Sequence, residues 1–199
     1  MREIAPGLWH WTALHPHIGK EVSSYYLAEE RVALDPLLPP EGLEWFADWP
    51  PAHVVLTNRH HERDSFQLHR EFGTEVHCIS NGVYELEGHG PVTPFEFGAE
   101  LPGGIVVHEV GAICPDETAL HIPAHRALAC ADGVVRWDGV EGLTFVPDSL
   151  MDDPPQTRAA LANAYHGLLD LDFDLLLLAH GAPVEGGARA ALAAFVESA

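Results

Sequence analysis

The sequence predicts an α/β fold built as one domain over residues 1–199, and three observations lead to that prediction. A short apolar strand is followed by a polar loop, a helix and another strand, which is the pattern of an α/β unit. Polar residues directly follow three apolar strands, at the carboxyl ends where α/β sheets bind ligands. The length and the hydrophobic fraction of 47% suit one globular core that folds without disulfide support.

The first third of the chain is predicted to consist mainly of strands. Residues 8–12 alternate in character, and residues 22–28 and 31–34 flank a short polar connection, as in a hairpin. Residues 41–49 carry apolar side chains at helical spacing, and the proline pair that follows would end such a helix. We therefore expect three strands and one helix in this part.

The middle section is predicted to be a strand, a polar loop, a helix and a strand. Residues 53–57 are a continuous apolar run, and the polar residues 58–64 follow it directly. Asp64 can cap a helix that runs to Phe72, where a glycine breaks it. Residues 75–79 form the next strand, so the polar loop lies at the carboxyl end of a strand.

The rest of the chain is predicted to add further strands and two helices. Frequent glycines and prolines over residues 82–104 indicate loops and short strands. The further strands are expected over residues 105–110, 119–122, 127–131 and 175–179, and the helices over 156–169 and 187–196. Because residues 175–179 are entirely apolar, that strand is expected to be buried on both faces.

The charge of the chain excludes several classes of partner. Ten Lys and Arg residues stand against 30 Asp and Glu residues, which gives a formal net charge of −20. Such a chain repels phosphate backbones and has no basic cluster for an anionic membrane surface, so we expect neither nucleic acid nor membrane as a partner. Three widely spaced cysteines predict no disulfide framework and favour a cytoplasmic location. The expected partner is a small-molecule substrate.

Three polar positions share one context, because each directly follows an apolar strand. These positions are residues 58–64, Asp132 and His180. Side chains at the ends of adjacent strands converge in space, so we expect these residues to lie close together. Fourteen histidines are many for this length, and they indicate metal or acid–base chemistry.

This pattern resembles the metallo-β-lactamase superfamily, whose fold is a four-layer αββα sandwich. That family carries T-H-x-H-x-D-H, G-H-x-P-G, T-G-D and G-H-G in this order. Here Thr57 matches the threonine of the first motif, and residues 112–116 occupy the position of the second. Asp132 and His180 match the last two motifs, and residues 32–35 resemble the family's early strand ending in aspartate. The resemblance covers nearly the whole chain.

The sequence retains only part of the metal-ligand set of the family that it resembles. Laid on Thr57, the first motif puts Asn58 at the first histidine and His60 at the second. Glu62 then stands for the aspartate, and Arg63 stands for the last histidine. A dinuclear zinc centre is therefore not expected, since asparagine is a poor zinc ligand and a guanidinium repels a metal cation.

A single metal ion remains compatible with the residues that match. Ile113 replaces the histidine of the second motif, whereas Asp132 and His180 are kept. The resemblance implies one divalent ion, zinc, manganese or iron, whose ligands would be His60, Asp132 and His180, with Glu62 or His61 helping. A site of this composition with an open position could activate water or polarise a carbonyl.

Two functions follow from these residues. By resemblance, the first is a metal-dependent hydrolase of a small ester, thioester, lactone or amide, in which Glu62 or Asp64 orients a ligand or transfers a proton. Asp64 is also explained simply as a helix cap. The second is a metal-free, inactive descendant that acts in binding or regulation, in which Arg63 replaces the metal charge and pairs with Glu62 and Asp132. A di-iron oxidoreductase would need a more complete ligand set.

Overall fold

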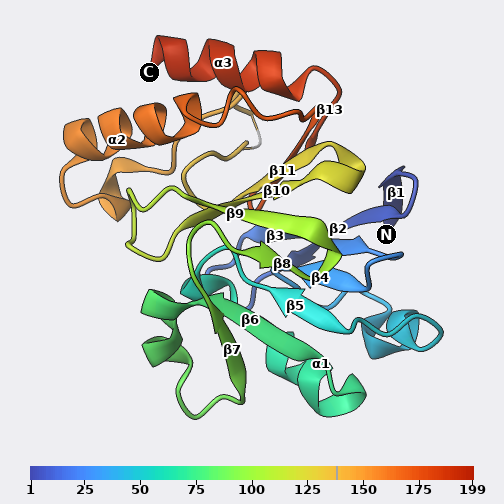
Figure 1. The fold of residues 1–199 in the computed structure, drawn as a ribbon. Helices are drawn as coiled ribbons and strands as arrows, with labels where there is room; N and C mark the ends of the chain where they lie inside the picture. The colour runs from blue at the N-terminus through green and yellow to red at the C-terminus, as the bar shows by residue number, and fades with distance from the viewer. Residues whose placement is uncertain (138) are drawn as a thin grey trace.

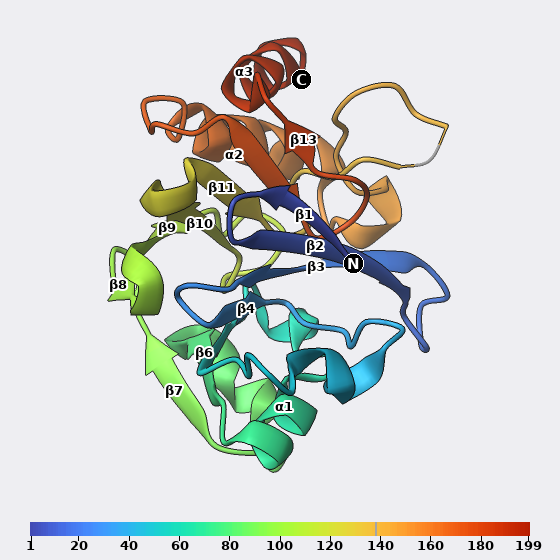
Figure 2. The same cartoon turned by 90° about the vertical axis from the view of Figure 1, so that its right-hand side faces the viewer.

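The computed structural model describes residues 1–137 and 139–199 and contains two β-sheets packed face to face, with helices on both outer sides (Figures 1 and 2). Helix α1 (Ser65–Phe72) lies on the outer side of the seven-stranded sheet. Helices α2 (Pro154–His166) and α3 (Ala188–Ser198) lie together on the outer side of the six-stranded sheet. The predicted four-layer αββα sandwich is confirmed.

The seven-stranded sheet is built from the first half of the chain in sequence order. Its strands are β1 (Arg2–Ala5), β2 (Leu8–Leu14), β3 (Glu21–Leu27), β4 (Val32–Leu34), β5 (His53–Val55), β6 (Glu75–Ile79) and β7 (Val92–Phe95). Pairing is antiparallel from β1 to β4 and parallel from β4 to β7. The predicted hairpin is β3 and β4, and the parallel part contains the predicted α/β unit.

The six-stranded sheet has the order β13-β12-β11-β10-β9-β8. Its strands are β8 (Glu100–Leu101), β9 (Ile105–Glu109), β10 (Thr118–Ile122), β11 (Ala127–Cys130), β12 (Leu175–Leu178) and β13 (Val184–Glu185). Pairing is antiparallel throughout, except that β11 and β12 are parallel. Helix α2 belongs to the crossover between these two parallel strands.

Strand β12 lies between β13 and β11 in the second sheet, and its position explains why all four of its residues are leucine. Leu177 belongs to the core between the two sheets, whereas Leu176 and Leu178 pack in the core under α2 and α3. Side chains of a strand alternate between faces, so a strand buried on both faces must be apolar at every position. The prediction that this strand is buried is therefore confirmed.

Short 3₁₀ helices connect the strands in the described residues. They are η1 (Gly42–Phe46), η2 (Arg59–His61), η3 (Ser80–Leu86), η4 (Pro102–Gly104), η5 (Pro123–His125) and η6 (Asp148–Leu150). The helix predicted over residues 41–49 is the short 3₁₀ helix η1. Helix α2 begins with a proline pair, and the Asp153 carboxylate accepts the N–H of Gln156 at 3.1 Å. This is the usual chemistry of a helix start.

No helix among the described residues is both long and apolar enough to cross a membrane.

The carboxyl ends of the parallel strands meet at one edge of the sandwich. Asp35 follows β4 and Thr57 follows β5 in the first sheet, while Asp132 follows β11 and His180 follows β12 in the second. Two backbone hydrogen bonds hold the sheets together at this edge, Ser23 N–H to the carbonyl of residue 179 (2.9 Å) and Thr118 N–H to the carbonyl of Thr57 (2.9 Å). All four polar residues are thereby brought to one place.

Candidate active site

Three side chains from different parts of the chain converge at this edge. The Nε2 atoms of His61 and His180 lie 3.3 Å and 3.1 Å from the same oxygen of Asp132, Oδ1. These three ligand atoms all lie within 4.8 Å of one another. Both histidines are buried and the aspartate is half-buried. Two imidazole nitrogens and one carboxylate oxygen therefore share a small, largely dry volume.

The 3₁₀ helix η2 decides which histidine of the His60-His61 pair takes part. Neighbouring residues of a 3₁₀ helix point about 120° apart, since the helix has three residues per turn. The His61 side chain is directed into the protein, whereas that of His60 is 54% exposed, with its Nδ1 3.7 Å from a carboxylate oxygen of Glu85. The backbone N–H of Arg59 donates to the buried carboxylate of Asp116 (2.7 Å), which fixes the orientation of this turn.

Asp35 holds the other side of the His61 ring. Its Oδ2 lies 2.9 Å from His61 Nδ1 and accepts the hydroxyl of Thr57 (2.6 Å), and its Oδ1 accepts the backbone N–H of Thr57 (2.8 Å). Asp35 has a φ of 45°, a left-handed conformation that is unfavourable for most residues with a side chain. A carboxylate bound to one ring nitrogen orients the opposite nitrogen, and metal-binding histidines are commonly held in this way.

The charges of the cluster stabilise one another. Burial disfavours the charged ring of His61, but the carboxylates of Asp132 and Asp35 outweigh burial and raise the pKa of His61 to about 9. Burial alone would raise the pKa of Asp132, yet His61 and the hydrogen bond from His180 hold it well below the usual range. The pKa of Asp35 is lowered in the same way, because the effect of His61 exceeds that of burial. Asp132 and Asp35 are therefore carboxylates at neutral pH.

Asn58 contacts the side chain of Asp132, and Glu117 contacts the backbone of the next residue, Gly133. The side-chain amide of the buried Asn58 donates to the second oxygen of Asp132, Oδ2, at 3.0 Å. Glu117, fully buried, accepts the N–H of Gly133 (2.6 Å) and that of Ile113 (3.2 Å). Burial and the nearby charge of Asp132 raise the pKa of Glu117 to about 7. Asn58 and Ile113 stand at positions matched to histidines of the family motifs. Asn58 contributes a side-chain hydrogen bond to Asp132, and Ile113 contributes its backbone N–H to Glu117.

Arg63 makes contacts different from those predicted. Its Nη1 donates to the backbone carbonyls of Ser23 (2.7 Å) and Asp35 (2.6 Å). In the described part of the chain no ion pair joins it to Glu62 or Asp132, so the predicted carboxylate fork is wrong. The physical reason is the backbone, because Arg63 has a φ of 46° in a left-handed turn and its guanidinium reaches β3. The other terminal nitrogen, Nη2, is buried and has no hydrogen-bond partner among the described residues.

Glu62 and Asp64 lie outside the cluster. The carboxylate of Glu62 is 2.6 Å from Nδ1 of His89, and that of Asp64 accepts the N–H of Leu38 at 2.7 Å. Asp64 occupies the N-cap position of α1, but its side chain makes no capping hydrogen bond. The structure therefore brings together Asp132, His180 and His61 of the predicted residues. It does not bring Glu62 or Asp64 to them.

The cluster lines a pocket of about 550 Å³. The loop between β2 and β3 and the segment around Pro147 form its walls. Apolar side chains contribute much of the lining, namely Ile18, Val22, Trp137, Val146, Pro147 and Leu150. The lining also includes His60 at the side and two cations, Arg63 and Lys20, the sole lysine of the sequence. The acidic chain thus has a locally cationic and apolar pocket.

Comparisons with known proteins identify the fold. No sequence profile of a protein family matches the chain, and no curated protein matches it by sequence. Among solved structures, DIM-1 metallo-β-lactamase is similar with a TM-score of 0.73 and 13% identity, over 98% of this chain and 95% of its own. TTHA1623 in a di-iron-bound form has a TM-score of 0.67 and 20% identity, over 90% of this chain and 96% of its own.

A third similar structure is a redox enzyme. Rubredoxin oxygen:oxidoreductase from Desulfovibrio gigas has a TM-score of 0.71 and 15% identity, over 98% of this chain and 60% of its own. The two facing sheets and the polar cluster at their edge define the chain as an α/β sandwich protein with a site between the sheets. More narrowly, the chain has the fold of the metallo-β-lactamase superfamily. That fold is shared by hydrolases and oxidoreductases, so function must be argued from the site.

The cluster fits one metal ion better than two. Two Nε2 atoms and one carboxylate oxygen form a three-ligand set with room for a fourth ligand from the pocket, which is the usual composition of a catalytic zinc site. At this edge the described residues offer no comparable set for a second ion, because Asn58 and Ile113 offer no imidazole and Arg63 adds a cation. The expectation of a single ion stays a prediction, with His61 in place of His60.

Proposed function

We propose that this chain is a metal-dependent hydrolase of a small ester, thioester, lactone or amide. The proposal is supported chiefly by the convergence of His61 Nε2 and His180 Nε2 on Asp132 Oδ1 in the lining of the pocket. These three residues would hold one divalent ion, zinc, manganese or iron. Such an ion, when bound, supplies a Lewis acid that polarises a carbonyl and lowers the pKa of water.

The surrounding residues would position the ligands. Asp35 holds Nδ1 of His61, so that Nε2 is directed at Asp132. Asn58 holds Oδ2 of Asp132, so that Oδ1 stays directed at the two histidines. Since each contact restrains a ligand before a substrate arrives, little reorganisation is required during the reaction.

Arg63 is proposed to act on the substrate itself. Its Nη1 is held by two backbone carbonyls, and the residue lines the pocket with Nη2 unpartnered among the described residues. A guanidinium keeps its charge at any physiological pH. A fixed cation of this kind beside the pocket would stabilise, through its charge, negative charge that develops on the carbonyl oxygen of the substrate.

The pocket supports a small, largely apolar substrate. A volume of about 550 Å³ is within the range of pockets that enclose small molecules. The apolar walls would hold an acyl or ring group, and Lys20 would attract a carboxylate on the substrate. The net charge of −20 would disfavour a nucleic acid in the same place. The three cysteines are buried free thiols, in keeping with a cytoplasmic enzyme.

Metal analysis combined with hydrolysis assays tests this proposal. Protein purified without chelators should contain about one equivalent of metal at this site and should hydrolyse some members of a panel of chromogenic esters, thioesters and lactones. Asp132→Asn and His180→Gln should each lose one equivalent of metal relative to the unchanged protein, together with the activity, because each removes one of three ligands. His60→Gln is the matched control and should keep the metal. Equal metal loss in the control would contradict the assignment.

The metal-free alternative is favoured by one observation of its own. Both oxygens of Asp132 already have partners, since His61 and His180 lie at one and Asn58 at the other. Together with Asp35, these residues could form a closed network without a metal ion, and the pocket would then serve for binding. Equal metal content in the unchanged protein and in Asp132→Asn, with equal stabilisation of both by zinc, manganese and iron against heat, would support this second function.

A further inference from the structure

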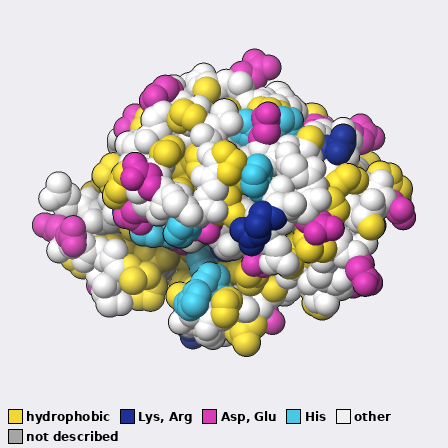
Figure 3. All heavy atoms as spheres, turned by 90° about the horizontal axis from the view of Figure 1, so that it is seen from below, with side chains coloured by type: hydrophobic (Ala, Val, Ile, Leu, Met, Phe, Trp, Pro, Cys, Tyr) yellow, Lys and Arg dark blue, Asp and Glu magenta, His cyan; other side chains and the backbone are white. Residues whose placement is uncertain are grey.

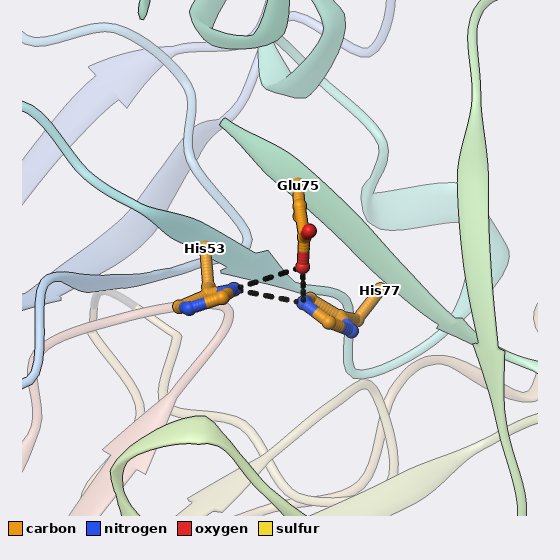
Figure 4. Close-up of side chains that lie close together, drawn as sticks. All are labelled: His53, Glu75 and His77. Atoms are coloured by element: carbon orange, nitrogen blue, oxygen red, sulfur yellow. Dashed lines mark hydrogen bonds and ion pairs between the residues drawn. The ribbon is translucent and has the colours of Figure 1, made fainter. Parts of the chain in front are cut away.

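A second histidine cluster lies on the parallel part of the first sheet, away from the pocket. Figure 4 shows His53 on β5 and Glu75 and His77 on β6, with their polar atoms gathered at one point between the strands. His53 Nδ1 lies 3.1 Å from His77 Nε2. The carboxylate oxygen Oε2 of Glu75 lies 3.5 Å from the first nitrogen and 3.6 Å from the second.

The sheet register creates this cluster. His53 is paired with Glu75 across the parallel strands β5 and β6, so both side chains lie on the same face. His77 is two residues beyond Glu75 and therefore points to that face as well. Both strands begin at this cluster, whereas the His61 site follows their carboxyl ends. The two groups of histidines thus lie at opposite ends of the same strands.

The spacing of the three atoms matches a metal site. Zinc binds imidazole nitrogen and carboxylate oxygen at about 2.0–2.2 Å with tetrahedral angles, which puts ligand atoms roughly 3.3–3.6 Å apart. The observed separations of 3.1, 3.5 and 3.6 Å are close to that range. His77 is buried and His53 half-buried, while the side chain of Glu75 is 61% exposed and leaves the cluster open to solvent on one side.

We propose that His53, Glu75 and His77 bind one divalent transition-metal ion, of the zinc class, with water completing the coordination. The ion would link β5 to β6 at their amino ends. Strand β5 leads directly into the turn that carries His61, so this link would stabilise the segment on which the active site is built. The proposed role is structural and does not depend on the function proposed for the pocket.

Zinc binding to the full-length protein, with both sites measured separately, tests the proposal. In a His180→Gln background, which weakens the pocket site, the protein should still bind one equivalent of Zn²⁺ by calorimetry after treatment with chelator. Adding Glu75→Gln should weaken that binding by at least about tenfold, since loss of residues that merely support ligands already costs about 10–100-fold. Glu75 is exposed, so this variant should fold.

A histidine pair without a carboxylate gives the matched control. His108 on β9 and His121 on β10 have ring centres 6.3 Å apart, and the described clusters that could hold a metal do not include them. Replacing both with glutamine should leave the zinc affinity unchanged. Unchanged affinity in Glu75→Gln, or equal losses in the control, would overturn the proposal, as would the absence of any zinc binding in the His180→Gln background.

Nuclear magnetic resonance can identify the histidine nitrogens that bind zinc. Long-range ¹H–¹⁵N spectra should show zinc-dependent shifts at Nδ1 of His53 and at Nε2 of His77, which are the nitrogens that face each other. If these nitrogens share only a hydrogen bond, the two signals will not respond to zinc, and the metal site is excluded. The readout is independent of enzyme activity.

Discussion

At the scale of single residues, the charge on His61 depends on two carboxylates. In protein stripped of metal, Asp132 and Asp35 raise the pKa of His61 to about 9, above its ordinary value of 6.5. The imidazolium therefore adds stability that is fully present below pH 6.5 and is lost as the pH rises through 9. We expect the free energy of unfolding to fall by roughly 2–4 kcal/mol over that interval.

Urea unfolding at pH 6, 7.5 and 9 in the presence of chelator measures this loss. His61→Gln should remove most of the pH dependence, because no titrating ring remains between the carboxylates. His60→Gln is the control, since that side chain is largely exposed, and it should retain the dependence. An unchanged pH dependence in His61→Gln would show that another group is responsible.

Gly181 restricts the backbone position of His180, the residue that precedes it. It has a φ of 90°, and a Cβ at this position would lie 1.9 Å from the carbonyl oxygen of Arg136. The backbone N–H of Arg136 also donates to the carbonyl of His180 at 3.0 Å. We expect Gly181→Ala to destabilise the protein by about 2–4 kcal/mol and to weaken metal binding, because the backbone beside His180 must shift.

Gly186 allows the steric effect to be separated from backbone strain. Its φ of 86° is almost the same, but a Cβ there would meet nothing within 4 Å. Thermal unfolding of Gly186→Ala should therefore report the strain of the left-handed conformation alone, at about 1 kcal/mol. Equal losses in Gly181→Ala and Gly186→Ala would show that the close approach to residue 136 has no effect.

Sequence motifs could not predict that His61, and not His60, contacts Asp132. Asp132 and His180 follow short strands made only of apolar residues, so their places at the strand ends are set by burial. His60 and His61 are adjacent, and only the direction of the 3₁₀ turn selects between them. The hydrogen bond from residue 59 to Asp116 that orients this turn spans 57 positions. No local pattern contains that information.

At the scale of secondary-structure elements, segments marked by apolar composition or by breaking residues were predicted, whereas two edge strands were missed. Strand β12 and helix α1 follow the predicted segments closely, because composition and breaking residues mark them. Strands β1 and β13 lie at sheet edges and contain no buried residue, so no apolar pattern marks them and they depend on partner strands already in place. The segment around residue 44 has helical spacing, yet its helix η1 extends over five residues only.

Tyr25 joins the two sheets through one side chain. Its hydroxyl donates to the carbonyl of Leu178 (2.8 Å) and accepts the N–H of the same residue (2.9 Å). Tyr25→Phe would leave both backbone groups without these partners in a buried place, so we expect a loss of about 1–3 kcal/mol in unfolding free energy. Since Leu178 precedes His180 by two residues, zinc affinity should also fall.

Chemical denaturation and zinc calorimetry of Tyr25→Phe test this role. Tyr84→Phe provides the control, because that hydroxyl is exposed and its partner is the neighbouring Glu85. The control should change the unfolding free energy by less than about 0.5 kcal/mol. A Tyr25→Phe protein as stable as the control would show that the inter-sheet hydrogen bonds contribute nothing net.

At the scale of the whole molecule, the excess of acidic residues opposes folding. On the face shown in Figure 3, acidic side chains are scattered widely and basic ones are few, so the charge is spread over the surface. With a net charge of −20, repulsion among these groups weakens the compact state. Salt should relieve this repulsion, because the screening length falls from about 30 Å at 0.01 M to about 3 Å at 1 M.

We therefore expect the urea midpoint to rise between about 0.02 M and 0.5 M sodium chloride, by an amount set by the repulsion that salt removes. A variant with Glu71, Glu87 and Glu197 changed to glutamine should be more stable at low salt and less sensitive to added salt. All three side chains are exposed and lie outside the ion pairs described. If salt lowers the midpoint, attractive pairs such as Arg126 with Asp172 outweigh the net repulsion, and the acidic surface is stabilising as built.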